Sequence, residues 1–402
     1  MSLRPSFLAL AAAAATLLLI PGCSRQSQPA PQATQPAPIP QIGGQPVVKL
    51  TRPATGNGQQ MEFLSVTVLP GRGMNVFQIT ANVPGKGEIP ILASPTLEEA
   101  ASKLNGGPDD QYGNQSFLIG GGAFLVPYPN RIIGPLSPDG KTITTKWHGK
   151  TIVLPANWHN SADPTRDKHA MHGLILASQT QDVQTQSIPD GQTLTGVIHA
   201  GDFGGHWLSQ TDLSFTIALT GPAVDATIVA KNVGKEDEPM AIGWHPYFAV
   251  PGGDRKQAML HVPGTQVAAI NNYQDVFPTG DLMPVKGTKY DFTAPGGKAL
   301  DDIYLDDNWS ELQRTDGAVD VTFADPASNY GVHILGLSPE IRTIQVYAPT
   351  DPTRQYAAIE EQFNFADPFG KEWGTMNTGM VTLKPGASVT WHVRLALFQP
   401  NK

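Results

Sequence analysis

The sequence predicts an all-β protein that folds as one large antiparallel β-sandwich. Short runs in which apolar residues alternate with polar ones recur from Met61 onward, bounded by Gly, Pro, Asn or Asp, and this is the pattern of half-buried strands. The 402 residues include 41 Gly and 36 Pro, which argues against a mainly helical chain. Because strand follows strand with almost no helix between them, antiparallel sheets packed as a sandwich are expected.

The strand segments form a single predicted body over residues 59–400. Length alone would allow two or three domains, but no Pro- or Ser-rich break interrupts the chain after residue 60. In the last segment, Val389, Trp391, Val393, Leu395 and Leu397 fall on one face. The clearest segments are FLSVTVL (63–69), NVFQITANV (75–83), KTITTKW (141–147), DLSFTIAL (212–219), DATIVAKNV (225–233), VDVTFA (319–324), IRTIQVYA (341–348) and SVTWHVRLALF (388–398).

One segment, PTLEEAASKLNG (95–106), predicts a helix. Thr96 is placed to cap its N-terminus, and Glu99 stands three residues later, which is the spacing of a capping box. Gly106 is the expected terminator.

Residues 1–22 have the organisation of a secretory signal peptide. Arg4 precedes an uncharged apolar run over residues 7–20, which is too short for a comfortable membrane span. The segment Ile20-Pro21-Gly22-Cys23 resembles a bacterial lipobox, although Pro21 departs from the usual small residue. We therefore expect an exported protein, periplasmic or at the cell surface, whose only membrane contact is a lipid anchor at Cys23. An ordinary signal peptide with an incidental cysteine is the alternative.

Residues 23–58 are expected to form a disordered tether. The stretch is dominated by Gln, Pro, Ala and Ser and has few large apolar residues to bury. Such a tether would let the globular body stand away from a membrane surface.

Charge and motif content exclude several classes of function. The formal net charge of −8 argues against a nucleic-acid partner, because phosphate neutralisation needs clustered Lys and Arg. A single cysteine excludes an intramolecular disulfide and any zinc or iron–sulfur site built from cysteines. The sequence has no Walker loop, dinucleotide fingerprint, His-Glu-x-x-His or Gly-x-Ser-x-Gly motif.

Polar residues interrupt apolar strand ends at five places, and each place has a structural as well as a chemical interpretation. Turns would explain Asn130-Arg131 and residues 301–304. A metal pair or a loop would explain residues 169–173, and a hydrogen-bonded core histidine would explain His245. In residues 359–363, two adjacent carboxylates must point to opposite faces of a strand, so at least one is either desolvated or lines a cleft. The five are Asn130-Arg131, residues 169–173 with His169 and His172, His245 within 244–248, Asp301-Asp302-Ile303-Tyr304, and residues 359–363 with Glu360 and Glu361.

Taken together and in this order, these motifs resemble the aldose 1-epimerase (galactose mutarotase) family over about residues 62–400. Each short match is common, but their shared order makes chance a poor explanation. The motifs are Asn130-Arg131-Ile132, Met171-His172-Gly173, His245-Pro246-Tyr247-Phe248, Pro278-Thr279-Gly280, Gly287-Thr288, Asp291-Phe292, Gln345-Val346-Tyr347, Glu360-Glu361-Gln362 with Asp367, and Leu383-Lys384-Pro385-Gly386.

The resemblance implies a galactose mutarotase-like β-supersandwich that interconverts the α and β anomers of a sugar without metal or cofactor. It implies that Glu360, two residues before Gln362, is the general base. It further implies that His245 is the general acid at the ring oxygen and that His172 stabilises the charge on the opened sugar.

The resemblance also implies a set of substrate-binding residues: Arg131, Asp301, Asn130 and Gln345. Arg131 and Asp301 would orient sugar hydroxyls, Asp301 because its spacing to Tyr304 fits an Asp-x-x-aromatic pattern. Asn130 would shape the turn that holds Arg131.

Several positions depart from the family pattern or leave alternatives open. Gly173 is followed by Leu174 where the family has a second glycine, so the loop would approach the ligand differently. Trp158 and Trp207 are candidates for stacking on a sugar or for packing. The alternative site residues are His169, Asp302 and Glu361.

The expected function is therefore an exported aldose 1-epimerase acting on a free hexose. The alternatives are a hexose-6-phosphate 1-epimerase, which would need further Arg or Lys beside the cleft, and a non-catalytic carbohydrate-binding lipoprotein. A small-molecule sugar is the expected partner, and the oligomeric state is left open.

Overall fold

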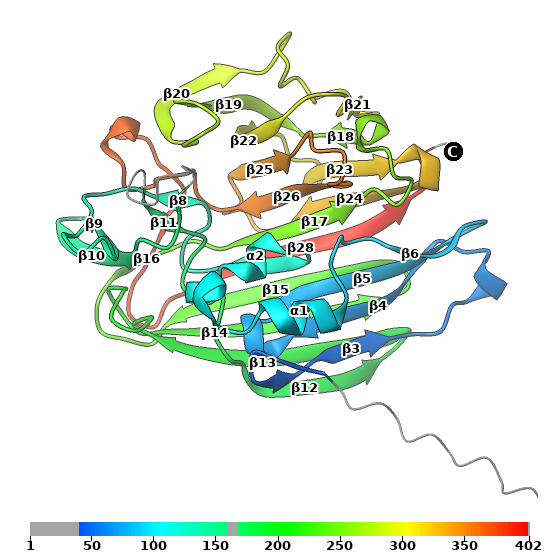
Figure 1. Ribbon diagram of the computed structural model, residues 1–402, viewed down its shortest axis with the longest axis horizontal. Helices are drawn as coiled ribbons and strands as arrows, with labels where there is room; N and C mark the ends of the chain where they lie inside the picture. The colour runs from blue at the N-terminus through cyan, green and yellow to red at the C-terminus, as the bar shows by residue number, and fades with distance from the viewer. Residues whose placement is uncertain (1–39, 160–167, 401–402) are drawn as a thin grey trace, which may run out of the picture. The chain divides into compact units, whose positions relative to one another are not determined.

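The computed structural model describes residues 40–159 and 168–400, which form antiparallel sheets (Figure 1). A nine-stranded sheet has the order β12 (Gln181–Ile188), β13 (Gly191–Gly201), β14 (Thr211–Thr220), β15 (Ala223–Asn232), β28 (Ser388–Phe398), β24 (Tyr330–Gly336), β23 (Val319–Asp325), β18 (Met259–His261) and β21 (Lys298–Ala299). A seven-stranded sheet has the order β20 (Pro278–Pro284), β19 (Gly264–Ile270), β22 (Leu305–Leu312), β25 (Thr343–Ala348), β26 (Tyr356–Gln362), β17 (Gly243–Ala249) and β7 (Gly122–Leu125).

Smaller sheets complete the body. A four-stranded sheet consists of β3 (Val48–Thr51), β4 (Glu62–Leu69), β5 (Asn75–Val83) and β6 (Gly87–Pro90). Two-stranded pairs are formed by β1 (Gln41–Ile42) with β2 (Gln45–Pro46), β8 (Arg131–Ile132) with β11 (Ala170–Met171), β9 (Thr142–Trp147) with β10 (Lys150–Pro155), and β16 (Glu238–Met240) with β27 (Val381–Leu383). The all-β, antiparallel prediction is confirmed.

Aromatic side chains fill the space between the two large sheets. Trp244 of β17 and Trp391 of β28 lie with ring centroids 6.3 Å apart, and Phe124 of β7 meets Phe215 of β14 at 5.7 Å. Along β28, Val389, Trp391, Val393 and Leu395 are buried and Leu397 is half-buried, as the alternation predicts. Burial of one face of each sheet is the main apolar stabilisation of the sandwich.

The prediction of a disordered tether over residues 23–58 is wrong for the C-terminal part of that segment. Residues 41–51 form β1, β2 and β3, and β3 pairs with β4, with Leu50 opposite Val66. Ile42, Val47 and Leu50 are buried. Composition did not reveal these strands, because their few apolar residues are separated by Gly, Gln, Pro and Lys. These three apolar side chains nevertheless pack against the β-sandwich. The predicted signal peptide and Cys23 lie outside the described residues.

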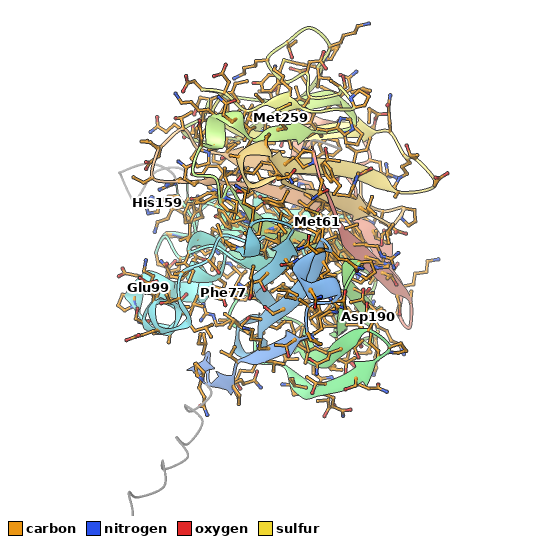
Figure 2. All side chains as sticks on the ribbon, turned by 90° about the vertical axis from the view of Figure 1, so that its right-hand side faces the viewer. Met61, Phe77, Glu99, His159, Asp190 and Met259 are labelled. Carbon is orange, nitrogen blue, oxygen red and sulfur yellow. The ribbon has the colours of Figure 1, made fainter. Side chains whose placement is uncertain are left out.

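The predicted helix is confirmed as α1 (Leu97–Lys103). Thr96 Oγ1 accepts a hydrogen bond from the Glu99 amide at 3.2 Å, and Glu99 Oε2 accepts one from the Thr96 amide at 3.0 Å, so the capping box is formed. Glu99, labelled in Figure 2, is exposed, whereas Phe77 of β5 is buried. No helix among the described residues is both long and apolar enough to cross a membrane.

A short second helix, α2 (Gln115–Leu118), was not predicted, and a buried ion pair holds the segment before it. Arg72, in the 3-10 helix Pro70–Arg72, donates to Asp110 at 2.7 Å and to Ser116 Oγ at 3.0 Å. The Arg72 and Asp110 side chains are almost fully buried. A helix of four residues is too short to show a helical period of apolar residues in the sequence. Its position depends instead on these long-range contacts.

We expect Asp110→Ala to lower the free energy of unfolding by about 3–5 kcal/mol, because it leaves the Arg72 guanidinium buried without its carboxylate. Chemical denaturation monitored by circular dichroism measures the change. The matched control is Asp109→Ala, since Asp109 is exposed and should change stability by less than about 0.5 kcal/mol. Equal effects of the two substitutions would contradict this account of the segment.

Candidate active site

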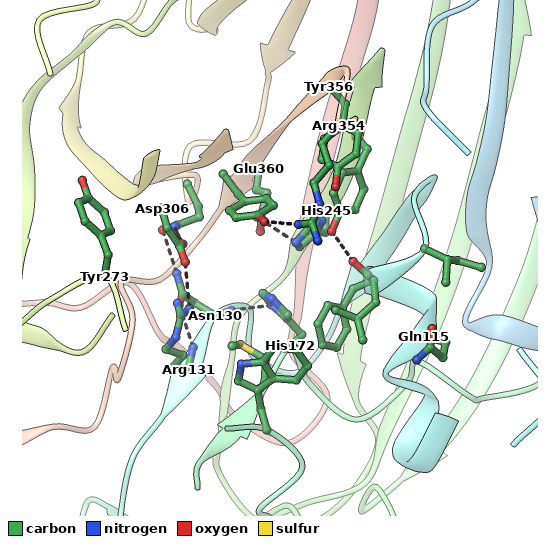
Figure 3. A pocket seen from close by; sticks show the side chains of 18 of the residues that line it. Gln115, Asn130, Arg131, His172, His245, Tyr273, Asp306, Arg354, Tyr356 and Glu360 are labelled. Atoms are coloured by element: carbon green, nitrogen blue, oxygen red, sulfur yellow. Dashed lines mark hydrogen bonds and ion pairs between the residues drawn. The ribbon is translucent and has the colours of Figure 1, made fainter. Parts of the chain in front are cut away.

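One face of the seven-stranded sheet forms the floor of a cleft of about 600 Å³ (Figure 3). This volume lies in the range of small-molecule sites. The walls come from α1 and α2, from β8 and β11, and from loops near β19 and β25. The lining residues are Lys103, Gln115, Phe117, Leu118, Ile119, Asn130, Arg131, Trp158, Met171, His172, His245, Tyr247, Tyr273, Gln274, Tyr304, Asp306, Gln345, Tyr347, Arg354, Tyr356 and Glu360.

The strand register brings three of the predicted residues into one row across the floor. Gln345 of β25 pairs with Glu360 of β26. The pairings of Gly243 with Gln362 and of Tyr247 with Ala358 put His245 of β17 opposite Glu360. Residues opposite each other on neighbouring strands share a face. The row therefore places an amide, a carboxyl group and an imidazole side by side.

Glu360 and His245 are in direct contact. His245 Nε2 lies 3.3 Å from Glu360 Oε1, and Gln362 Nε2 donates to Glu360 Oε2 at 2.7 Å. Burial raises the pKa of Glu360 well above its ordinary value, and burial lowers the pKa of His245 to about 4. Both shifts favour a pair that holds one proton and carries no net charge at neutral pH.

The two adjacent glutamates point to opposite faces of β26, as predicted. Glu360 lines the cleft, while Glu361 is fully buried on the other face. Neither carboxyl oxygen of Glu361 has a hydrogen-bond partner within the described part of the chain, and burial raises its pKa well above the ordinary value. Glu361, one of the alternative site residues, is therefore a neutral core side chain outside the cleft.

Four polar side chains form a closed ring at one end of the cleft. Asn130 Nδ2 donates to Gln345 Oε1 at 3.1 Å, and Gln345 Nε2 donates to Asp306 Oδ1 at 2.7 Å. Arg131 closes the ring by donating to Asp306 Oδ2 at 3.3 Å and to Asn130 Oδ1 at 3.0 Å. The ring fixes the Arg131 guanidinium and the Asp306 carboxylate at the surface of the cleft.

His172 enters the cleft from a strained turn after β11. Its backbone φ is 60°, and that of Asn130 is 62°, a left-handed conformation that Asn tolerates better than most residues. A Cβ atom on Gly173, where φ is 79°, would lie 2.4 Å from the Val126 carbonyl oxygen, so this position requires glycine. The turn brings His172 to His245, with ring centroids 5.1 Å apart.

The hydrogen bonding of His172 defines its tautomer. His172 Nδ1 accepts a hydrogen bond from the Asn130 amide at 3.3 Å. Burial, with the nearby charges of His245 and Arg131, lowers the pKa of His172 well below its ordinary value. A neutral imidazole that accepts at Nδ1 carries its proton on Nε2, so His172 is a hydrogen-bond donor at that atom.

Asp301 was predicted as a substrate-binding residue, and the structure places it elsewhere. It lies in an exposed turn with φ of 49°, where its amide donates to the Lys256 carbonyl, and it does not line the cleft. Asp302 is also exposed and pairs with Lys256. Asp306 takes the predicted place. Spacing to Tyr304 misled the prediction, because Asp301 lies in a turn that points away from the cleft, whereas Asp306 lies within β22 and lines the cleft.

The remaining candidates divide between the cleft and the core. Trp158 lines the cleft and packs against Phe117, with centroids 5.5 Å apart. His169 is buried beside Phe277 and does not line the cleft. Trp207 is buried against Tyr128 and donates to the Pro239 carbonyl, which makes it a packing residue.

The cleft also contains residues that sequence reasoning missed. None of its five tyrosines was predicted as a site residue, and neither Lys103 nor Arg354 was. The tyrosines are Tyr247, Tyr273, Tyr304, Tyr347 and Tyr356. Tyr247, Tyr304 and Tyr347 belong to motifs recognised in the sequence, whereas Tyr273 and Tyr356 do not. Among residues 40–159 and 168–400, no group of three or more His, Cys, Asp or Glu side chains could hold a metal ion.

An antiparallel β-sandwich with a carboxyl–imidazole pair in an open, aromatic-lined cleft defines a protein built for acid–base chemistry on a small polar ligand. The family model described as aldose 1-epimerase matches residues 92–396, and the chain belongs to the aldose 1-epimerase family.

Several solved structures have a fold similar to that of this chain. A galactose mutarotase-like protein from Clostridium acetobutylicum is 20% identical, with a TM-score of 0.66 over 84% of this chain and 93% of its own. A GalM/aldose epimerase homologue from C. elegans is 15% identical, with a TM-score of 0.64 over 88% and 98%. Galactose 1-epimerase from Lactobacillus acidophilus is 14% identical, with a TM-score of 0.59 over 88% and 98%. No curated protein sequence matches the chain significantly.

Proposed function

We propose that the protein is a mutarotase that interconverts the α and β anomers of a free hexose or a related reducing sugar by opening and closing its ring. The contact of 3.3 Å between His245 Nε2 and Glu360 Oε1 carries the proposal. In a hemiacetal, the anomeric hydroxyl and the ring oxygen are both bonded to C1. A base and an acid that serve these two oxygens at once must therefore lie side by side, as these two groups do.

A single proton shared by the pair balances the reaction. In the resting pair the proton is on Glu360, and its transfer to His245 gives the reactive form, in which Glu360 is ionised and His245 is protonated. Glu360 takes the proton of the anomeric hydroxyl, His245 gives its proton to the ring oxygen, and the C1–O5 bond breaks to leave a carbonyl group at C1. Rotation about C1–C2 followed by the reverse proton transfers closes the ring on the other face. The pair ends with the same single proton, so turnover needs no outside acid or base.

The surrounding residues have separate roles in this proposal. His172, as a donor at Nε2, stabilises negative charge that develops on a sugar oxygen. The ring of Asn130, Gln345, Asp306 and Arg131 presents fixed donors and acceptors to the sugar hydroxyls, so the ligand is oriented before the protons move.

Polarimetry of freshly dissolved α-glucose and α-galactose with residues 40–402 tests the proposal. We expect relaxation of the optical rotation to accelerate in proportion to protein concentration. The main alternative is a non-catalytic carbohydrate-binding protein. Saturable sugar binding without such acceleration would favour that alternative and contradict the mutarotase proposal.

The proposal extends to an exported enzyme attached through Cys23, on the basis of the signal-like residues 1–22. Such a location would equilibrate anomers where sugars reach the cell. Mass spectrometry of the mature N-terminus tests this point, because lipidation adds acyl chains to Cys23 and Cys23→Ser should release the protein from membranes.

A further inference from the structure

The cleft has an excess of positive charge, although the chain has a formal net charge of −8. Its cationic residues are Lys103, Arg131 and Arg354, and its carboxyl groups are those of Asp306 and Glu360. Arg131 and Asp306 pair with each other, and the raised pKa of Glu360 favours its neutral form. Two cations, Lys103 and Arg354, therefore lack a compensating carboxylate in the cleft.

Arg354 is held in place by its neighbours. It lies in the loop between β25 and β26, and its Nη1 donates to Tyr347 Oη at 2.8 Å. The next residue anchors the loop, because Gln355 Oε1 accepts a hydrogen bond from the Arg255 amide at 2.8 Å. A side chain fixed by a tyrosine hydroxyl and an anchored backbone loses less entropy when it binds a ligand.

The nearest carboxylate does little to neutralise Arg354. Asp351 Oδ2 lies 3.7 Å from Arg354 Nε, and both side chains are about half exposed. The other carboxyl oxygen, Asp351 Oδ1, already accepts two hydrogen bonds from Thr353. An exposed ion pair with this geometry contributes little, so the guanidinium keeps donors for a ligand.

Arg354 lies at the end of the cleft that carries His245. Two tyrosines connect Arg354 with His245. The ring centroid of Tyr247 is 4.9 Å from that of His245 and 4.8 Å from that of Tyr356, and the Tyr356 hydroxyl interacts with Arg354. Figure 3 shows Arg354 and Tyr356 beside His245, on the other side of Glu360 from Asp306 and Arg131. Arg131 and Arg354 therefore lie at opposite ends of the part of the cleft that contains Glu360 and His245.

The inference rests on the proposed function, in which His245 faces the ring oxygen. The ring carbon on the far side of that oxygen from C1 is C5, and its substituent is C6. The C6 group therefore extends from the His245 end of the cleft toward Arg354. We infer that the preferred substrate carries a negatively charged group at C6, either the carboxylate of a hexuronic acid or the phosphate of a hexose 6-phosphate. Guanidinium groups suit both anions.

Turnover of three sugars tests the inference. Mutarotation of glucose, glucuronic acid and glucose 6-phosphate is followed by NMR exchange with wild-type protein and with Arg354→Gln. We expect kcat/KM for at least one of the two anionic sugars to exceed that for glucose by roughly 10- to 100-fold, the contribution of one or two charge-assisted hydrogen bonds. Arg354→Gln should reduce this ratio about tenfold or more. The anionic sugar whose kcat/KM exceeds that of glucose shows whether the preferred anion is a carboxylate or a phosphate.

The control and a binding measurement separate failure of this inference from failure of the proposed function. Arg342→Gln removes an exposed arginine outside the cleft and should leave the ratio unchanged. Methyl α-glucuronide and methyl α-glucoside cannot mutarotate, so calorimetric titration with them measures preference for the anion even if no sugar is turned over. A preference for the glucuronide that is lost in Arg354→Gln supports the inference. Equal affinity for both glycosides, together with a kcat/KM ratio near one, overturns it.

Discussion

Replacing Glu360 by Gln should reduce kcat for mutarotation by roughly 10²–10⁴-fold, the usual contribution of a general base. The amide cannot take the proton of the anomeric hydroxyl, but it has nearly the same shape as the carboxyl group. Its carbonyl oxygen can still accept the hydrogen bond that Gln362 Nε2 gives to Glu360 at 2.7 Å. Sugar affinity should therefore stay within about tenfold, since general-base loss acts on the transition state. Polarimetry measures the rate, and calorimetric titration measures the affinity.

The chain provides its own matched control in Glu361→Gln. Glu361 is the adjacent residue on the same strand, is equally buried and has a pKa raised by the same cause, but it faces away from the cleft. The same substitution there should leave kcat within about twofold of the wild-type value. Unchanged turnover in Glu360→Gln, or similar losses in both variants, would exclude Glu360 as the base.

Local sequence pattern predicted that Glu360 and Glu361 point to opposite faces of one strand. Two adjacent carboxylates in an apolar segment were enough to place one glutamate in a cleft or in the core, and the structure has one in each. The same signal occurs in Leu305-Asp306-Asp307-Asn308-Trp309, where Asp306 lines the cleft and Asp307 is buried on the other face. The rule alone does not separate this pair from Asp301-Asp302, which also stands between apolar residues but lies in an exposed turn.

Local pattern could not predict the distances across the site. His245 and Glu360 meet because β17 and β26 pair in one particular register, and a shift of one residue would turn either side chain to the other face. That register is determined by the packing of the whole sheet. In the sequence, only the resemblance to a known family pointed to this contact.

Rim residues were the least predictable part of the site. Arg354 occurs in a Pro- and Asp-containing turn that is typical of a surface loop, and Lys103 ends a helix in which Glu98, Glu99 and Ser102 are exposed. Each reaches the cleft because its loop or helix is held there by contacts with segments distant in sequence. The Gln355–Arg255 hydrogen bond is one such contact.

Replacing His245 by Asn should reduce kcat by roughly 10²–10⁴-fold and should also reverse the alkaline pH dependence. In the wild-type protein the active pair holds one proton. A second proton enters as the pH falls through about 4, the pKa of His245, and leaves no base. The single proton is lost as the pH rises through the raised pKa of the pair, which leaves no acid. The wild-type kcat/KM should thus form a plateau that falls on both sides.

Without His245, the residual reaction needs only an ionised Glu360, so kcat/KM of the variant should rise with pH through the range where that of the wild type falls. Loss of packing alone would lower the rate without inverting the profile, so the sign of the slope separates a chemical role from a structural one. His199→Asn is the matched control, because His199 is exposed and lies outside the cleft. It should keep both the wild-type rate and the wild-type profile. A His245→Asn variant whose rate still declines at high pH would show that another group supplies the proton to the ring oxygen.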